Sequence, residues 1–140
     1  MKTEELPPIR FPLVNRFLKD NGHKGKVRGN ERAFILRNDQ GKIVAALRAC
    51  SKTEGYLLRS VQVDRTLYGK GYGSRLVKEA ALMLMPAQCW CYPFRHLQHF
   101  YEECEFQQCS PQEVPEDIRG PYERYVQQDQ GLLLMVFRLS

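Results

Sequence analysis

Three closely spaced glycines form the part of the sequence best suited to chemistry. Gly69, Gly71 and Gly73 lie between a predicted strand and a predicted helix over residues 74–85. Glycine tolerates a positive φ angle and lets a ligand approach the backbone closely. The first amides of a helix lack intrahelical partners, and the helix dipole is positive there. The turn therefore predicts a site for an anion such as phosphate; the alternative is a tight turn that holds nothing.

The spacing of these glycines excludes two common phosphate-binding motifs. No Gly-Lys-Ser/Thr follows a four-residue gap, as a P-loop requires, and a GxGxxG pattern needs glycine at position 74, where Ser74 stands. A dinucleotide fold is thus disfavoured. Lys70 and Arg75 add positive charge around the turn.

The other reactive residue types do not form a convincing metal or redox site. His96 and His99 are three residues apart and have no third ligand near them in the sequence, so no metal is predicted. The five cysteines form no CxxC pair and are interpreted as free thiols. Glu54 precedes a predicted strand and is better interpreted as a solvated turn residue than as a general base.

The elements that must position the glycine turn follow from hydrophobic periodicity and turn residues. We expect helices over residues 11–19, 74–85 and 96–104, a hairpin of strands 33–37 and 42–50, and further strands at 55–64, 88–92, 106–109 and 131–139. Residues 110–130 are expected to form a long loop, and such loops are often functional. In strand 55–64 the side chains of Leu57, Arg59, Val61 and Val63 are expected to share one face. The order of elements predicts an α+β fold with a mixed central β-sheet flanked by helices.

Length and composition bound the class of protein. The 140 residues suit one domain, 1–140. The formal net charge is +5, from 21 Lys and Arg against 16 Asp and Glu, with the basic residues scattered. This charge suits an anionic ligand; no aromatic–basic platform accompanies it, so nucleic-acid binding ranks last. No apolar run is long enough to span a membrane and no signal peptide is recognisable, so a cytoplasmic protein is expected.

At the glycine turn the sequence resembles the GNAT N-acetyltransferase superfamily. That family's pyrophosphate-binding motif is commonly R-G-x-G-x-G and follows a strand that carries a Val. Val63 matches that Val, and the three glycines of the turn match the glycines of the motif. Tyr68 stands where Arg or Gln is usual. A second family pattern, FY-E-x-x-G-F, is matched by residues 100–106, with Glu105 in place of the glycine. Phe94 stands where the family often has Asn. The resemblance covers roughly residues 33–106 and the terminal strand.

The resemblance implies a GNAT-like acyl-CoA N-acyltransferase fold, with a V-shaped opening between neighbouring parallel strands 55–64 and 88–92. The pantetheine of acetyl-CoA would pair with the backbone there. The implied cofactor-binding residues are Val61, Val63, Tyr68, Gly69, Lys70, Gly71, Tyr72, Gly73 and Ser74. The amide of Val63 would polarise the thioester carbonyl, and Tyr101 would protonate the departing thiolate.

The function expected from this resemblance is transfer of an acetyl group from acetyl-CoA to a primary amine of a small molecule or peptide. Residues 113–119 carry acidic groups that would suit a cationic amine if they line the acceptor pocket; they are equally interpreted as a solvated connector. No general base is evident, so a catalytically idle acetyl-CoA-binding module that regulates a protein partner is the alternative. The end strands of the sheet would allow a homodimer.

Overall fold

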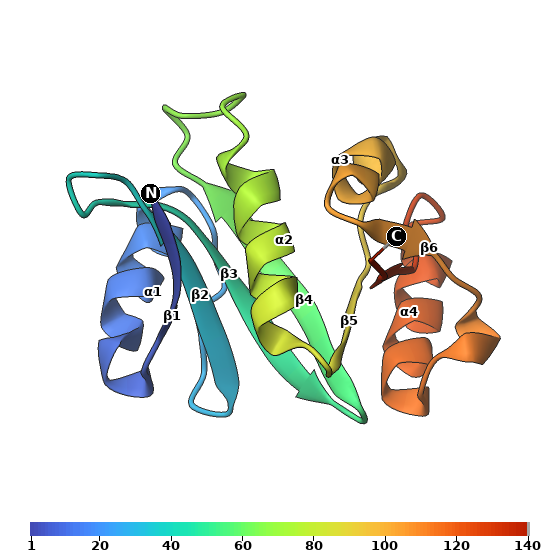
Figure 1. Ribbon diagram of the computed structural model, residues 1–140. Helices are drawn as coiled ribbons and strands as arrows, with labels where there is room; N and C mark the ends of the chain where they lie inside the picture. The colour runs from blue at the N-terminus through green and yellow to red at the C-terminus, as the bar shows by residue number, and fades with distance from the viewer. Residues whose placement is uncertain (140) are drawn as a thin grey trace.

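The structure, a computed structural model, describes residues 1–139, and its backbone is organised around a seven-stranded mixed β-sheet of order β1-β2-β3-β4-β5-β7-β6 (Figure 1). The strands are β1 (Lys2–Leu6), β2 (Glu31–Arg37), β3 (Ile43–Lys52), β4 (Gly55–Val63), β5 (Gln88–Cys91), β6 (Phe106–Gln108) and β7 (Met135–Phe137). The helices are η1 (Pro8–Arg10), α1 (Phe11–Asp20), α2 (Tyr72–Leu84), η2 (Arg95–Leu97), α3 (Gln98–Glu103), η3 (Pro111–Glu113) and α4 (Glu116–Gln128). Among the strand pairs formed by residues 1–139, only β4 and β5 are parallel.

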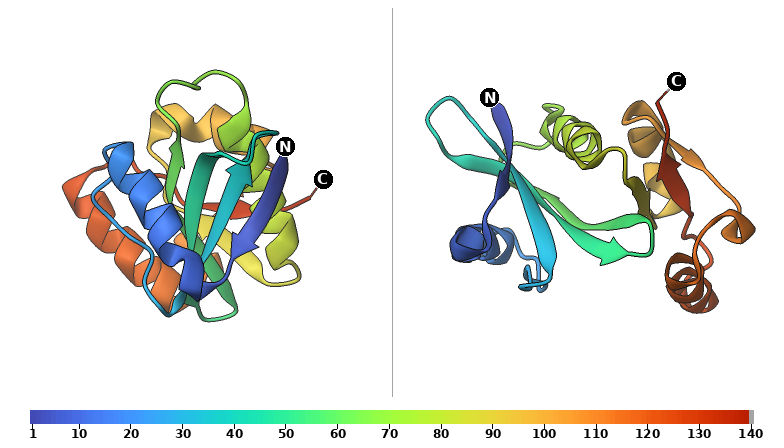
Figure 2. Two further views of the ribbon diagram at one scale, coloured as in Figure 1. Left: turned by 90° about the vertical axis from the view of Figure 1, so that its left-hand side faces the viewer. Right: turned by 60° about the horizontal axis from the view of Figure 1, so that its bottom comes forward.

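Helices cover both faces of the sheet. In Figure 2, α1 and α4 lie on one face, and α2 and α3 lie on the other. The largest hydrophobic core lies under α2 and α3, where the buried stripe of α2 (Leu76, Val77, Ala80, Ala81 and Leu84) packs on the sheet. Two smaller cores lie on the opposite face, one under α1 and one under α4. Both faces of the sheet are therefore buried over much of their length.

Strands β4 and β5 pair over a short distance and then separate. Gly55, Tyr56 and Leu57 pair with Gln88, Cys89 and Trp90, whereas β4 continues to Val63 without a partner on that side. Figure 1 shows the two strands together near the C-terminal end of α2 and apart beside its N-terminal end. The predicted V-shaped opening between these strands is confirmed.

A β-bulge in β4 lies at the start of this separation. Ser60 has φ +58°, and the register with β3 shifts between the pairs Ala46–Gln62 and Arg48–Arg59. The extra residue changes which side chains share a face. Leu57 packs with α4, whereas Val61 and Val63 pack in the core under α2 and α3. The expected strict alternation, with Leu57 and Arg59 on the face of Val61 and Val63, is therefore wrong.

Most predicted elements are present, and three differences have physical causes. The predicted loop 110–130 contains α4, a helix with Pro121 inside it, which breaks the local pattern that would have indicated a helix. The predicted strand 131–139 is shorter, because only Met135–Phe137 forms the ladder. β1 was not predicted: only Leu6 of this strand is buried, and pairing with β2 holds its polar residues in place.

Candidate functional site

The glycine turn leaves the N-terminus of α2 open. Gly71 is the N-cap residue, with φ +80° and ψ +8°, and no side chain caps the helix. Ser74 does not act as a cap, because its hydroxyl donates to the carbonyl of Gly71 at 3.1 Å. A Cβ atom added at Gly69 (φ +82°) or at Gly71 would meet nothing within 4 Å. The first amides of α2 therefore face open space and have no competing side-chain acceptor.

A cleft of about 650 Å³ lies between this turn, β4 and α3. It is lined by Val61, Gln62, Val63, Leu67, Tyr68, Gly69, Gly71, Tyr72, Gly73, Ser74, Leu97, Phe100, Tyr101 and Glu103. Gly73 lets the first turn of α2 approach the cleft wall closely: an added Cβ would lie 3.1 Å from Val63 Cγ2 and 3.4 Å from Phe100 Cζ.

The edge of β4 that borders this cleft presents backbone groups. The amide of Asp64 donates to the carbonyl of Val44 in β3 at 2.8 Å. Because successive amides along an extended strand point to opposite edges, the amide of Val63 points away from β3 and toward the opening. Gln62 Nε2 donates to the carbonyl oxygen of Val63 at 3.1 Å and to the hydroxyl of Tyr68 at 3.2 Å. The strand edge thus offers donors and acceptors for a ligand that runs beside it.

Tyr101, on α3, lies where this cleft ends. Its ring is 8% exposed and packs edge-to-face on Phe100 and Phe106, with centroids 5.0 and 5.8 Å away. Within residues 1–139 its hydroxyl makes no hydrogen bond. Burial, and to a lesser degree the neighbouring Cys91 and Cys104, raise the pKa of Tyr101 well above its usual value. The hydroxyl therefore stays protonated and able to donate.

A second cleft, of about 380 Å³, lies on the face of the sheet that carries α1 and α4. Its lining comes from the loop after α1, β4, the end of β5 and the segment after it, η2, α3, α4 and the segment before β7: His23, Leu58, Arg59, Ser60, Val61, Cys91, Tyr92, Pro93, Phe94, Leu97, Tyr101, Tyr125 and Leu132. Val61, Leu97 and Tyr101 line both clefts. The two clefts therefore meet at Tyr101, from opposite faces of the sheet.

The structure brings most of the predicted site residues together. All of the predicted cofactor-binding residues line the first cleft except Lys70, which lies exposed in the turn. Arg75 does not contribute, because its guanidinium pairs with Glu79 at 3.2 Å and donates to the carbonyl of Met1. His99 pairs with Glu103 and His96 stacks on Phe94. Among the described residues no group of three or more metal-ligating side chains converges.

The acidic segment 113–119 lines neither of these two clefts. Glu113, Glu116 and Asp117 line a separate cavity with Thr53 and Glu54, at the end of β3 and the start of β4. Asp117 accepts hydrogen bonds there from the amide and the hydroxyl of Thr53. The expected role of this segment beside the acceptor stays a prediction.

Glu105 keeps the backbone geometry that glycine normally provides. Its φ is +69°, in the left-handed region that favours glycine, and its carboxylate lies 3.8 Å from Lys78 Nζ. The turn after α3 is thus preserved despite the substitution.

Val61 and Tyr101 were predicted as site residues, whereas Arg59 and His23 of the second cleft were not. Arg59 follows two buried leucines in β4, and His23 lies in a loop recognised only as basic and glycine-containing. A charged residue in the middle of an otherwise apolar strand was the available signal for Arg59. Burial, together with Arg48 and Arg59, lowers the pKa of His23 below the usual 6.5.

Residues 29–108 match the family described as the acetyltransferase (GNAT) domain. The sequence matches no curated protein. No helix within residues 1–139 is long and apolar enough to cross a membrane.

Solved structures share the fold at low identity. Rv2747 from Mycobacterium tuberculosis, in complex with CoA and NLQ, has a TM-score of 0.67 at 16% identity, with 100% of each chain covered. N-acetylglutamate synthase from Neisseria gonorrhoeae, complexed with coenzyme A and L-arginine, has a TM-score of 0.65 at 16% identity, covering 99% of this chain and 33% of that one. Tetrahymena GCN5 has a TM-score of 0.68 at 12% identity, covering 98% and 95%. The α+β fold expected from the sequence is confirmed.

Proposed function

The chain belongs to the acetyltransferase (GNAT) domain family, and on that premise we propose that it is an acetyl-CoA-dependent N-acetyltransferase acting on a primary amine. One observation carries this proposal: the open N-terminus of α2 and the free edge of β4 border a single cleft that ends at Tyr101. Two of the structural relatives were solved with CoA bound, which supports this choice of cosubstrate.

The residues of the cleft fit acetyl-CoA in two parts. The amides at Gly71, Tyr72, Gly73 and Ser74 would bind the diphosphate, since a helix N-terminus favours negative charge and no protein side chain competes. Gly69 shapes the turn, and Tyr68 and Lys70 flank it. The backbone groups of Val61 and Val63 on the open edge of β4 would pair with the amides of the pantetheine arm.

Acetyl transfer requires one bond to form and one to break. The acceptor, as a neutral amine, attacks the thioester carbonyl carbon; the C–N bond forms, the C–S bond breaks, and the amine loses one proton while the thiolate gains one. The amide of Val63 is placed to donate to the carbonyl oxygen as negative charge develops on it. Tyr101 would supply a proton to the thiolate as the C–S bond breaks; because its pKa is raised, the hydroxyl stays protonated until then but is a weaker acid than a free tyrosine.

The test combines acetyl-CoA turnover with removal of the Tyr101 hydroxyl. Purified protein is assayed for CoA release with a panel of primary amines. Tyr101→Phe should lower kcat by about 100-fold, the lower range for loss of general acid catalysis, and leave the KM for acetyl-CoA unchanged. The matched control is Tyr56→Phe, which removes a hydroxyl that accepts from Arg32 at 3.0 Å and belongs to a residue lining neither cleft, and it should keep kcat.

Three results would contradict the proposal at different levels. An unchanged kcat in Tyr101→Phe would remove Tyr101 from the mechanism. CoA binding without turnover of any amine would favour the catalytically idle regulatory module. Absence of CoA binding in calorimetry would remove the enzyme interpretation entirely.

A further inference from the structure

We propose that the acceptor amine also carries a carboxylate, and that the guanidinium of Arg59 binds this carboxylate in the second cleft. The inference rests on the proposed acetyl transfer and deepens it, because it names the class of acceptor: a small amino acid rather than a polyamine or a lysine side chain.

Arg59 is a cation without a counterion. It lies in the middle of β4, one residue before the bulge at Ser60, and its side chain is exposed in the second cleft. In the part of the chain that the structure describes, its guanidinium makes neither an ion pair nor a hydrogen bond. A planar guanidinium with all of its donors available matches the geometry of a carboxylate. Arg59 and Tyr101 line one cavity, so the acceptor's carboxylate and its amine can be held by the same cleft.

No carboxylate lines this cleft to offset that charge. Among its lining residues the charged or titratable groups besides tyrosine and cysteine are Arg59 and His23. The neighbouring Glu31 is already engaged: it pairs with Arg48 at 3.2 Å and accepts from Cys50 Sγ and from the amide of Arg28. A polycationic acceptor would therefore bring like charge against Arg59 with no acidic partner, which is unfavourable in a partly buried site.

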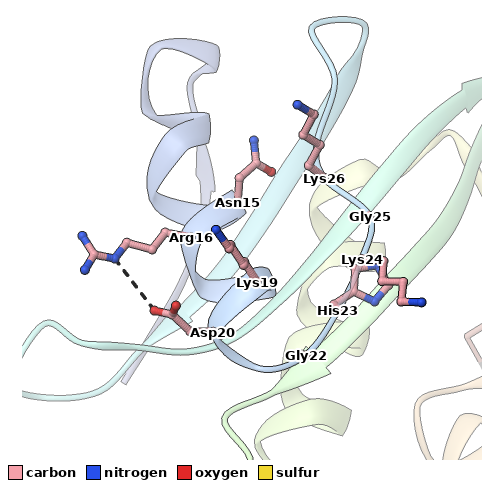
Figure 3. Close-up of a pocket in the computed structure, with 9 residues that line it drawn as sticks. All are labelled: Asn15, Arg16, Lys19, Asp20, Gly22, His23, Lys24, Gly25 and Lys26. Carbon is pink, nitrogen blue, oxygen red and sulfur yellow. Dashed lines mark ion pairs between the residues drawn. The ribbon is translucent and has the colours of Figure 1, made fainter.

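The surroundings of the cleft extend the same positive field. Beside it lies an open cavity of about 910 Å³ at the end of α1, which shares His23 with the second cleft. Lys19, Lys24 and Lys26 line this cavity and pair with no carboxylate among the described residues, whereas Arg16 pairs with Asp20. Figure 3 shows the three ammonium groups spread widely rather than converging on one point. They form no joint ligand site, but together they favour the approach of an anion.

The walls and volume of the cleft indicate a small acceptor. A cavity of about 380 Å³ lies at the small end of the range for ligand pockets. Tyr92 and Tyr125 form an aromatic wall, with centroids 6.0 Å apart, and Tyr92 is fixed by a 2.6 Å hydrogen bond from its hydroxyl to the carbonyl of Ile118. This space suits a free amino acid whose side chain is at least partly apolar.

The experiment compares each acceptor with a version that lacks only the carboxylate charge. L-phenylalanine and L-leucine are assayed against their α-methyl esters, and spermidine serves as the polycation. Esterification lowers the pKa of the amine and so raises the fraction of reactive neutral amine, which by itself favours the ester. We expect wild-type kcat/KM to be about tenfold or more higher for the free amino acid, in the range of one charge-assisted hydrogen bond. Arg59→Ala should reduce this ratio to about one or below, and Arg59→Glu should invert it, while the KM for acetyl-CoA stays unchanged.

A control and a binding measurement make the result independent of turnover. Arg10→Ala removes the same charge from an exposed position outside both clefts and should keep the wild-type ratio. The CoA complex is also titrated with each amino acid and each ester by calorimetry. Binding of the amino acid that is lost in Arg59→Ala supports the inference even if no amine is acetylated.

Three outcomes overturn the inference. One is faster turnover or tighter binding of the esters or spermidine by the wild-type protein; such turnover would leave the proposed acetyltransferase activity intact. Another is an Arg59→Ala variant that keeps the wild-type preference for the free amino acid. The third is failure of the CoA complex to bind any of the amino acids.

Discussion

Replacing Gly71 with alanine separates the structural role of the glycine turn from its role in binding. Gly71 has φ +80°, where an L-residue is strained, but an added Cβ would meet no atom within 4 Å. Gly41, in the turn between β2 and β3, has φ +81° and the same empty surroundings. The two substitutions therefore carry the same backbone strain, and only Gly71 lies at the N-terminus of α2.

The strain should cost about 1 kcal/mol in the free energy of unfolding at each position, which corresponds to roughly 4 °C in Tm for a chain of this size. At Gly71 a change in the turn would also misalign at least one amide that is proposed to bind the CoA diphosphate. A hydrogen bond to a charged group contributes about 1.5–3 kcal/mol, so the Kd for CoA should rise about 10- to 100-fold in Gly71→Ala. In Gly41→Ala it should stay within about twofold of the wild-type value.

Thermal unfolding without ligand and calorimetric titration with CoA provide the two measurements. Equal losses of stability would show that the strain is matched. If CoA then binds both variants with wild-type affinity, the amides of this turn do not hold the diphosphate, and the assignment of the first cleft fails. Equal weakening in both variants would instead attribute the loss to reduced stability.

Two further predictions follow from the same structure. The imidazole of His23 should titrate below pH 6.5 in a histidine NMR titration, and Arg59→Ala should raise its pKa, because Arg59 is one of the charges that lower it. Since the unfolded chain binds this proton more readily than the folded chain, the contribution of His23 to stability should rise with pH through the window below 6.5. An unchanged pKa of His23 in Arg59→Ala would show that the two groups do not interact. Glu105→Gly should leave kcat unchanged and relieve a left-handed backbone that costs about 1 kcal/mol in the free energy of unfolding, while it also removes the side-chain contacts of Glu105, the ion pair with Lys78 among them. We expect the relieved strain to outweigh those contacts, so Tm should rise, and a fall in Tm would show the reverse.

The sequence predicted the central elements of the fold because their signals are local. The buried stripe of α2 follows helical spacing, and the hairpin of β2 and β3 is marked by its turn residues. The order strand, glycines, helix likewise predicted that the glycine turn leaves the N-terminus of a helix open. Tyr101 was predicted through a family pattern. Its position between two clefts depends on how α3 packs, and the residues next to it in the sequence do not predict that packing.

The elements that were missed are held by tertiary contacts. Strand β1 has one buried residue, and ion pairs from Glu4 to Arg37 and from Glu5 to Arg32 support its place at the sheet edge. Helix α4 contains Pro121 and buries only Ile118 fully, so its periodicity is weak. The start of α4 did carry a readable signal, because Pro115 is followed by two acidic residues in the first turn.

The bulge at Ser60 would let one strand serve the two proposed ligands on opposite faces of the sheet. In a regular strand Arg59 and Val61 would share a face, and the proposed carboxylate site would lie on the cofactor side. The additional residue, with φ +58°, lets Arg59 remain in the second cleft while Val61 and Val63 join the core beneath α2. Because β5 has already separated from β4 at this point, the backbone edge between the two faces is unpaired. An amine held from one side and a thioester held from the other can then meet at Tyr101, the residue of α3 that reaches both clefts. On the proposed function, the local irregularity in β4 is therefore what would let two substrates approach each other across a sheet that is otherwise buried.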